Sequence, residues 1–151
     1  MTATSSYALE EIPIFGAIPP DVLARFVPPL KHLHLDANAV VFREGEPGRE
    51  MYLVLSGEVE IVKQNQKGGE PHVAIIDPFN LFGEMSLLDL QPRSATARTK
   101  VPSHLLRIAS EDLDALYRFD LKSYALFVLN IAPNLSRRLR AAQSALAEAK
   151  D

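Results

Sequence analysis

The sequence predicts a mainly β domain, a jelly-roll or Greek-key barrel, with helical segments before and after it. Short strand-like runs, separated by turn residues, follow one another through the middle of the chain. No long helical segment lies between these runs, which argues against a parallel sheet with crossover helices. After residue 109 the apolar spacing becomes helical. The 151 residues, 47% of them apolar, suffice for one domain with a sizeable core.

The first segment, residues 7–30, is expected to be helical in short pieces because several prolines interrupt its pattern. Pro20 suits the first turn of a helix, where its missing N–H is not needed. Leu23 and Phe26 then lie on one apolar side, and Pro28 ends the helix.

The barrel is expected in residues 31–109. Its predicted strands are Lys31–Leu35, Ala39–Phe42, Met51–Ser56, Glu58–Lys63, His72–Asp77, Ala95–Thr99 and His104–Ala109. Gly45, Gly48 and Gly57 stand between strands, and we interpret them as turn glycines rather than ligand contacts.

Helices are expected in the third segment, residues 110–150. Ser110 is a suitable N-cap, and two acidic residues follow it in the first turn, where the helix dipole favours them. A second helix is predicted from about Leu121 to Lys150. Pro133 lies inside it and should kink it or split it in two.

The composition of the chain argues against several classes of function. The formal net charge of −3 gives no global basic field for nucleic acid or anionic lipid. Without cysteine there are no disulfides, thiolate metal sites or cysteine nucleophiles. The first residues do not resemble a signal peptide, and the longest apolar run, Tyr124–Ala132, is too short to cross a bilayer. We therefore expect a soluble, cytoplasmic protein.

Side chains suited to anion binding concentrate in residues 81–97. Gly83 allows the backbone to approach a ligand closely, and a short helix beginning near Glu84 would offer unpaired amides to an anion. Arg93 supplies a planar, charged fork for phosphate oxygens. Glu84 cannot serve the same anion and needs a donor, such as a hydroxyl of the same ligand. This combination indicates a sugar phosphate.

Two stretches resemble the family of cyclic nucleotide-binding domains. The residues Phe82-Gly-Glu-Met-Ser-Leu-Leu88 and Pro92-Arg-Ser-Ala-Thr-Ala97 are similar to the family's phosphate-binding cassette. Residues 41–59 resemble its early barrel strands. The resemblance extends from about residue 11 to 146 and implies an eight-stranded β-roll with N-terminal helices and two C-terminal helices, the last of which acts as a lid.

The resemblance also implies a role for each matching residue. Glu84 would accept a hydrogen bond from the ribose 2′-hydroxyl, and Arg93 would pair with the exocyclic phosphate oxygens. The implied contacts beyond these two are the cassette residues Gly83, Met85, Ser86, Ser94 and Ala95, the pocket-lining residues Leu81, Phe82 and Val73 or Ile75, and the lid residues Arg137 or Arg138.

The implied function is a regulatory module that binds a cyclic mononucleotide and is not an enzyme. We expect cAMP rather than cGMP, because cGMP-preferring members commonly place threonine where this chain has Ser94. The alternative is a sensor fragment of a longer regulator whose output domain is absent. DNA binding by this chain alone is not expected, since no room for a helix-turn-helix follows Leu121. A weak homodimer through a 4-3 spacing of apolar residues, or an effector protein, remains open as partner.

Other interpretations of single residues carry less weight. His32 and His34 share one strand face, as in metal-binding cupins, but the expected glutamate does not follow them. We therefore predict no metal site and no cofactor. His72 and His104 are expected to be exposed strand residues. Glu84 and Arg93 could instead form an ordinary surface ion pair.

Overall fold

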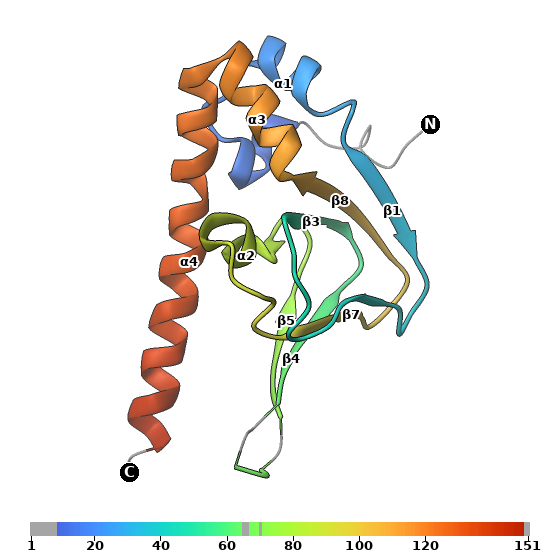
Figure 1. The fold of residues 1–151 in the computed structure, drawn as a ribbon, viewed down its shortest axis with the longest axis vertical. Helices are drawn as coiled ribbons and strands as arrows, with labels where there is room; N and C mark the ends of the chain where they lie inside the picture. The colour runs from blue at the N-terminus through green and yellow to red at the C-terminus, as the bar shows by residue number, and fades with distance from the viewer. Residues whose placement is uncertain (1–8, 65–66, 70, 150–151) are drawn as a thin grey trace.

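Two four-stranded antiparallel sheets form the barrel in the computed structural model, which describes residues 9–64, 67–69 and 71–149 (Figure 1). The first sheet has the order β1 (Lys31–Leu35), β8 (Ser103–Ala109), β3 (Glu50–Ser56) and β6 (Leu81–Phe82). The second has the order β2 (Val40–Phe42), β7 (Thr96–Thr99), β4 (Val59–Lys63) and β5 (His72–Ile76). The predicted jelly-roll class is confirmed.

All seven predicted strands are present, with ends that differ by at most one residue from the prediction. The eighth strand, β6, was not predicted. It has only two residues, which pair with Tyr52 and Leu53 of β3, and so short a run shows no alternation of apolar and polar residues.

In the first sheet, β3 and β8 are buried on both faces, and neighbouring residues of each strand point to opposite sides. On β8, Leu105 points into the barrel, where it packs with residues of both sheets such as Val54 and Val59. Leu106 and Ile108 point outward and join the core formed with the helices. β8, in which every residue except Arg107 is buried, is therefore a strand covered on both faces.

Short helical elements precede the barrel: the 3-10 turns η2 (Leu9–Glu11) and η3 (Pro13–Phe15), and helix α1 (Pro20–Phe26). The helix begins at Pro20 as predicted. After the barrel come α3 (Ser110–Phe119) and α4 (Leu121–Ala149), and α4 extends along one side of the molecule (Figure 1). Asn130 links α4 to the segment before the barrel, because its Nδ2 donates hydrogen bonds to the backbone carbonyls of Ile14 at 3.0 Å and Gly16 at 2.9 Å.

The expected cap of the first C-terminal helix was wrong, and of the two outcomes expected at Pro133, a kink or a split, the split does not occur. Ser110 is the first residue of α3 rather than its cap, and the Asp112 carboxylate accepts a hydrogen bond from the N–H of Ala109, the residue at the cap position, at 2.8 Å. Pro133 does not split α4, which continues through it. The carbonyl four residues earlier belongs to Leu129, which is 65% exposed, so water can replace the missing proline N–H. No helix among the described residues is long and apolar enough to cross a membrane.

Candidate functional site

The site is built where β6 passes into the short helix α2 (Glu84–Asp89). Gly83 makes this turn with a left-handed backbone (φ 81°), a conformation that favours glycine. A Cβ at this position would also lie 2.9 Å from Nη1 of Arg93. The first N–H groups of α2, which have no acceptor within the helix, are thus presented beside the Arg93 guanidinium. This confirms the short helix expected after Gly83.

Glu84, the first residue of α2, is fully buried, and Ser86 is buried beside it. Fully buried carboxylates are rare in proteins because desolvation of the charge is costly. The burial also excludes the alternative of an ordinary surface ion pair between Glu84 and Arg93. Neither side chain is at the surface, since Arg93 is only 3% exposed.

The Arg93 guanidinium lies in a slot between an aromatic ring and a glycine. Its Cζ is 4.0 Å from the centre of the Phe42 ring, a cation–π contact. On another side is Gly48, where an added Cβ would fall within 2.5 Å of the guanidinium atoms Nε, Cζ and Nη2. Gly48 does not have the positive φ of Gly45 and Gly57. The interpretation of Gly48 as a turn residue was therefore wrong: it leaves room for Arg93.

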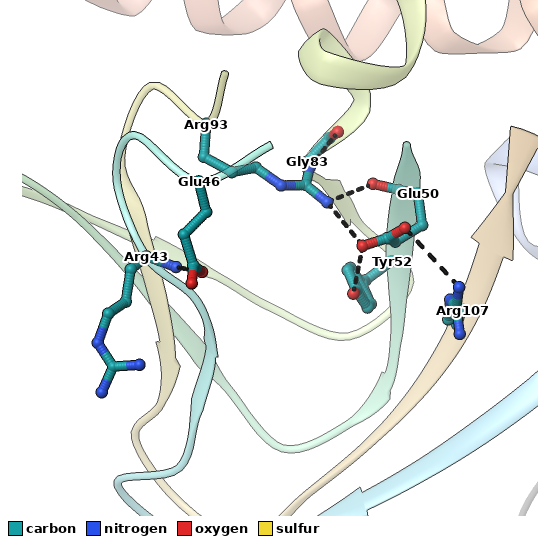
Figure 2. A network of polar contacts seen from close by, with 7 residues as sticks. All are labelled: Arg43, Glu46, Glu50, Tyr52, Gly83, Arg93 and Arg107. Carbon is teal, nitrogen blue, oxygen red and sulfur yellow. Dashed lines mark hydrogen bonds and ion pairs between the residues drawn. The ribbon is translucent and has the colours of Figure 1, made fainter. Parts of the chain in front are cut away.

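Arg93 is held by hydrogen bonds to β3 and to the turn between β6 and α2 (Figure 2). Its Nη1 donates to the Gly83 carbonyl at 3.0 Å. Its Nη2 donates to the backbone carbonyl of Glu50 at 2.9 Å and to the Glu50 carboxylate at 3.3 Å. Among the described residues, the buried Nε has no acceptor. Three of the five N–H donors of Arg93 are thus used within the protein, and the buried Nε–H remains available.

Glu50 is the centre of a small polar network (Figure 2). Its Oε1 meets Arg93 and accepts a hydrogen bond from the Tyr52 hydroxyl at 3.4 Å, while its Oε2 lies 3.8 Å from Nη2 of Arg107. Burial, and secondly the negative charge of Glu50, raise the pKa of Tyr52 to about 12. Tyr52 therefore stays a neutral donor at physiological pH.

A cavity of about 50 Å³ adjoins this network. Its walls are Phe42, Ile61, Phe82, Gly83, Met85, Ser86, Arg93, Ser94 and Ala95. Seven of these nine were predicted from the sequence, and Phe42 and Ile61 were not. The cavity is much smaller than the roughly 300–1,000 Å³ of typical ligand sites. It can hold only part of a nucleotide unless its walls move.

The structure does not bring three of the predicted lining residues to this cavity. Val73 and Ile75 are 44% and 40% exposed. The cavity residue Ile61 pairs with Ala74, so Val73 and Ile75 lie on the opposite face of β5. Ala74, between them, is the residue of β5 that lies opposite Ile61. Leu81 likewise points away from its neighbour Phe82, into the core beneath the helices.

The predicted lid residues also lie away from this cavity. Arg137 lines a different cavity of about 340 Å³, between α4, η3 and the segment before β6. That cavity has an apolar floor that includes Ile14 and Phe79, and Arg140 stands beside Arg137. The side chain of Arg138 lies outside the described residues. In this conformation, then, Arg137 does not cover the cassette.

Four residues of the network around Arg93 and Glu50 were not predicted as site residues from the sequence: Phe42, Gly48, Glu50 and Arg107. Gly48 and Glu50 stood in the stretch that resembles the family's early barrel strands, but nothing in the spacing indicated that this stretch meets Arg93. Arg107 lies within the predicted strand His104–Ala109, but its position in the strand did not indicate that it faces Glu50. These contacts join segments about forty or more residues apart, as the separation of Glu50 and Arg93 illustrates.

The histidines form a cluster that the sequence did not predict. His104 is only 4% exposed, so the expectation of an exposed strand residue was wrong. Its Nε2 lies 2.8 Å from Nδ1 of His32, and its ring stacks on that of His34 at 4.1 Å. The part of the chain that the structure describes has no group of three or more side chains suited to hold a metal ion. The side chain of His72 lies outside the described residues.

Comparisons with known proteins agree with this architecture. A family model for the cyclic nucleotide-binding domain matches residues 32–119, more than half of the chain. The "CRP-like cAMP-activated global transcriptional regulator" of Mycobacterium tuberculosis is 33% identical over 137 residues, which are 89% of this chain and 58% of that protein. The "Cyclic AMP receptor protein" of Thermus thermophilus is 41% identical over 102 residues, which are 68% of this chain and 45% of that protein.

The fold is shared with solved structures as well. The crystal structure of the Thermus thermophilus catabolite activator protein has a TM-score of 0.76 and 34% identity, and the match covers 89% of this chain and 62% of that one. The chain spans about half of the length of the curated relatives named above. The matched segment contains both sheets except Lys31 of β1, together with the cassette helix α2 and Arg93. On this evidence the chain belongs to the cyclic nucleotide-binding domain family.

Proposed function

We propose that this chain is a regulatory module that binds cAMP in preference to cGMP and catalyses no reaction. The observation that carries the proposal is the joint burial of Glu84 and Arg93 at the two ends of the cassette. A buried guanidinium with a spare Nε donor suits a phosphate, and a buried carboxylate suits a sugar hydroxyl. The names of the relatives, which are cAMP-activated or cAMP-receptor proteins, support the same ligand.

The cassette supplies binding groups of opposite character in one small volume. The first amides of α2 and the Arg93 guanidinium attract an anion, while the Phe82 ring and Ile61 offer apolar surface. A cyclic nucleotide has a monoanionic phosphate, a free 2′-hydroxyl and a flat base, so it matches each of these parts. Ser94 at the cavity, rather than threonine, is the basis for preferring cAMP.

Ligand binding is proposed to move the C-terminal helices. The cavity of about 50 Å³ must open for a nucleotide, and Leu87 of α2 packs against the core that includes Leu113 of α3 and Phe127 of α4. A shift of α2 would therefore be transmitted to α4. The segment after Pro133 would then cover the base, with Arg137 or Arg138 stacked on it.

The partner that reads this movement is also a proposal. The chain works as a cytoplasmic sensor, whether alone or as the sensing part of a longer cAMP-responsive regulator. It does not bind DNA by itself. A weak homodimer through α4 is the first candidate assembly, because Leu139 on the 4-3 seam is 60% exposed.

Calorimetric titration with cAMP tests the binding proposal. Arg93→Ala should cost roughly 2–5 kcal/mol of binding, because it removes the charge that pairs with the phosphate. Glu84→Gln should cost less, about 1.5–3 kcal/mol, since one charge-assisted hydrogen bond is weakened. Arg98→Ala is the matched control, because Arg98 pairs with Glu60 on the outer face of the barrel. Unchanged affinity in Arg93→Ala would remove the proposal.

Competition between the two nucleotides tests the ligand preference. cAMP should bind more tightly than cGMP, by a modest factor, and Ser94→Thr should narrow the difference by offering guanine a better-placed hydroxyl. Tenfold tighter binding of cGMP by the unmodified protein would reverse the assignment.

A further inference from the structure

Arg93 is already paired with an anion of the protein itself. The side pair of donors that a guanidinium usually offers to a phosphate consists of Nε and Nη2, which point to the same side. Here Nε has no acceptor among the described residues, but Nη2 donates to the carbonyl and to the carboxylate of Glu50. A phosphate that uses both donors must therefore share or take Nη2 from Glu50.

Glu50 is free to give up this contact. Its carboxylate is 25% exposed, and its contact to Arg93, at 3.3 Å, is longer than the 2.9 Å bond from Arg93 to the Glu50 backbone carbonyl. The other carboxylate oxygen faces Arg107, whose side chain is 36% exposed and is not among the residues that line the cassette cavity. When the Arg93 contact is lost, Arg107 and solvent still compensate the charge of Glu50, while the backbone carbonyl still holds the guanidinium.

The charge of Glu50 acts against an anionic ligand in two ways. It occupies part of the guanidinium that the ligand needs, and it repels a phosphate placed beside Arg93. Arg107 acts in the opposite sense, because it draws the Glu50 carboxylate away from Arg93 and offsets its charge. Both residues lie on the first sheet, Glu50 on β3 and Arg107 on β8, so their positions relative to Arg93 are fixed by the barrel.

We propose that Glu50 is an affinity-determining residue, a built-in competitor that the phosphate of the ligand displaces from Arg93, and that Arg107 sets the strength of this competition. The inference rests on the proposed function, because it concerns the same binding site. Its consequence is a lowered affinity for cyclic nucleotide, which keeps the module in its ligand-free state until the ligand concentration rises.

The test is calorimetric titration with cAMP of the full chain and of Glu50→Gln, which keeps an oxygen acceptor at the same place but removes the charge. Affinity should rise about tenfold in Glu50→Gln. It should fall about threefold to tenfold in Arg107→Gln, where Glu50 is left to Arg93 alone. The double variant should bind like Glu50→Gln, because Arg107 acts only through Glu50. Glu60→Gln, the same change of charge on the outer face of β4, is the control and should leave the affinity unchanged.

A merely structural role for Glu50 would have the opposite sign, since loosening Arg93 weakens binding. Unchanged or weaker binding by Glu50→Gln, with normal binding by the unmodified chain, overturns the inference and leaves the proposed function intact. Binding by Glu50→Gln when the unmodified chain shows none supports the inference in its strongest form. Absence of binding in both proteins removes the proposed function and the inference together.

Discussion

Replacing Gly48 by alanine should destabilise the protein through Arg93 alone. An added Cβ would fall within 2.5 Å of Nε, Cζ and Nη2 of Arg93, whereas ordinary contact begins near 3.4 Å. The guanidinium must therefore move by about 1 Å or leave its slot. It then loses its hydrogen bonds to Gly83 and Glu50 at 2.9–3.3 Å. Hydrogen bonds of a charged group contribute about 1.5–3 kcal/mol, and we expect a loss of this size in the free energy of unfolding.

A double-mutant cycle with urea denaturation isolates this clash. In an Arg93→Ala background the new methyl group meets no guanidinium, and Gly48→Ala should cost almost nothing. The thermal midpoint of the single variant should fall by roughly 3–12 °C for a chain of this size. Equal costs of the alanine in both backgrounds, within about 0.5 kcal/mol, would refute the reasoning and would mean that Gly48 is needed for its backbone.

Three further predictions concern the rest of the fold. Burial, together with His34 and His32, lowers the pKa of His104 below its usual 6.5, so the unfolded chain takes up a proton first and stability is lost as pH falls through about 6.5. The thermal midpoint should be lower at pH 5 than at pH 7.5, and less so in His104→Phe. Asn130→Ala, which leaves two backbone carbonyls of the N-terminal segment without their donor, should cost about 1–3 kcal/mol on urea unfolding. Hydrogen exchange of residues 134–146 should slow when cAMP is added, and equal protection in both states would contradict the lid.

The strands could be predicted closely because each has enough residues to show its own pattern and is bounded by turn residues. β6 could not, since two residues carry no periodicity. The face of the sheet to which each side chain points was harder to predict than the bounds of the strand. Val73 and Ile75 were chosen as apolar residues of a correctly predicted strand, yet both faces of β5 carry apolar residues, so the alternation did not say which face meets the cavity.

In the site, too, the parts formed by residues close together in the chain could be predicted, and the parts formed by distant residues could not. Gly83, Glu84 and the start of α2 are neighbours in the chain, so their geometry follows from a left-handed glycine before a helix and could be inferred from the sequence. The surroundings of Arg93 could not be inferred from the sequence in this way. Its ring partner Phe42, its space at Gly48 and its acceptor Glu50 come from the other end of the barrel sequence.

This difference has a consequence for the function of the site. The local groups provide the chemistry that recognises a sugar phosphate, whereas the distant groups decide how strongly Arg93 is engaged before the ligand arrives. Substitution at Glu50 or Arg107 can therefore change the affinity without changing the cassette sequence. Two chains with identical cassettes should then respond to different ligand concentrations if they differ at these two positions. On this proposal, the cassette motif predicts the class of ligand, whereas Glu50 of β3 and Arg107 of β8 set the concentration at which it binds.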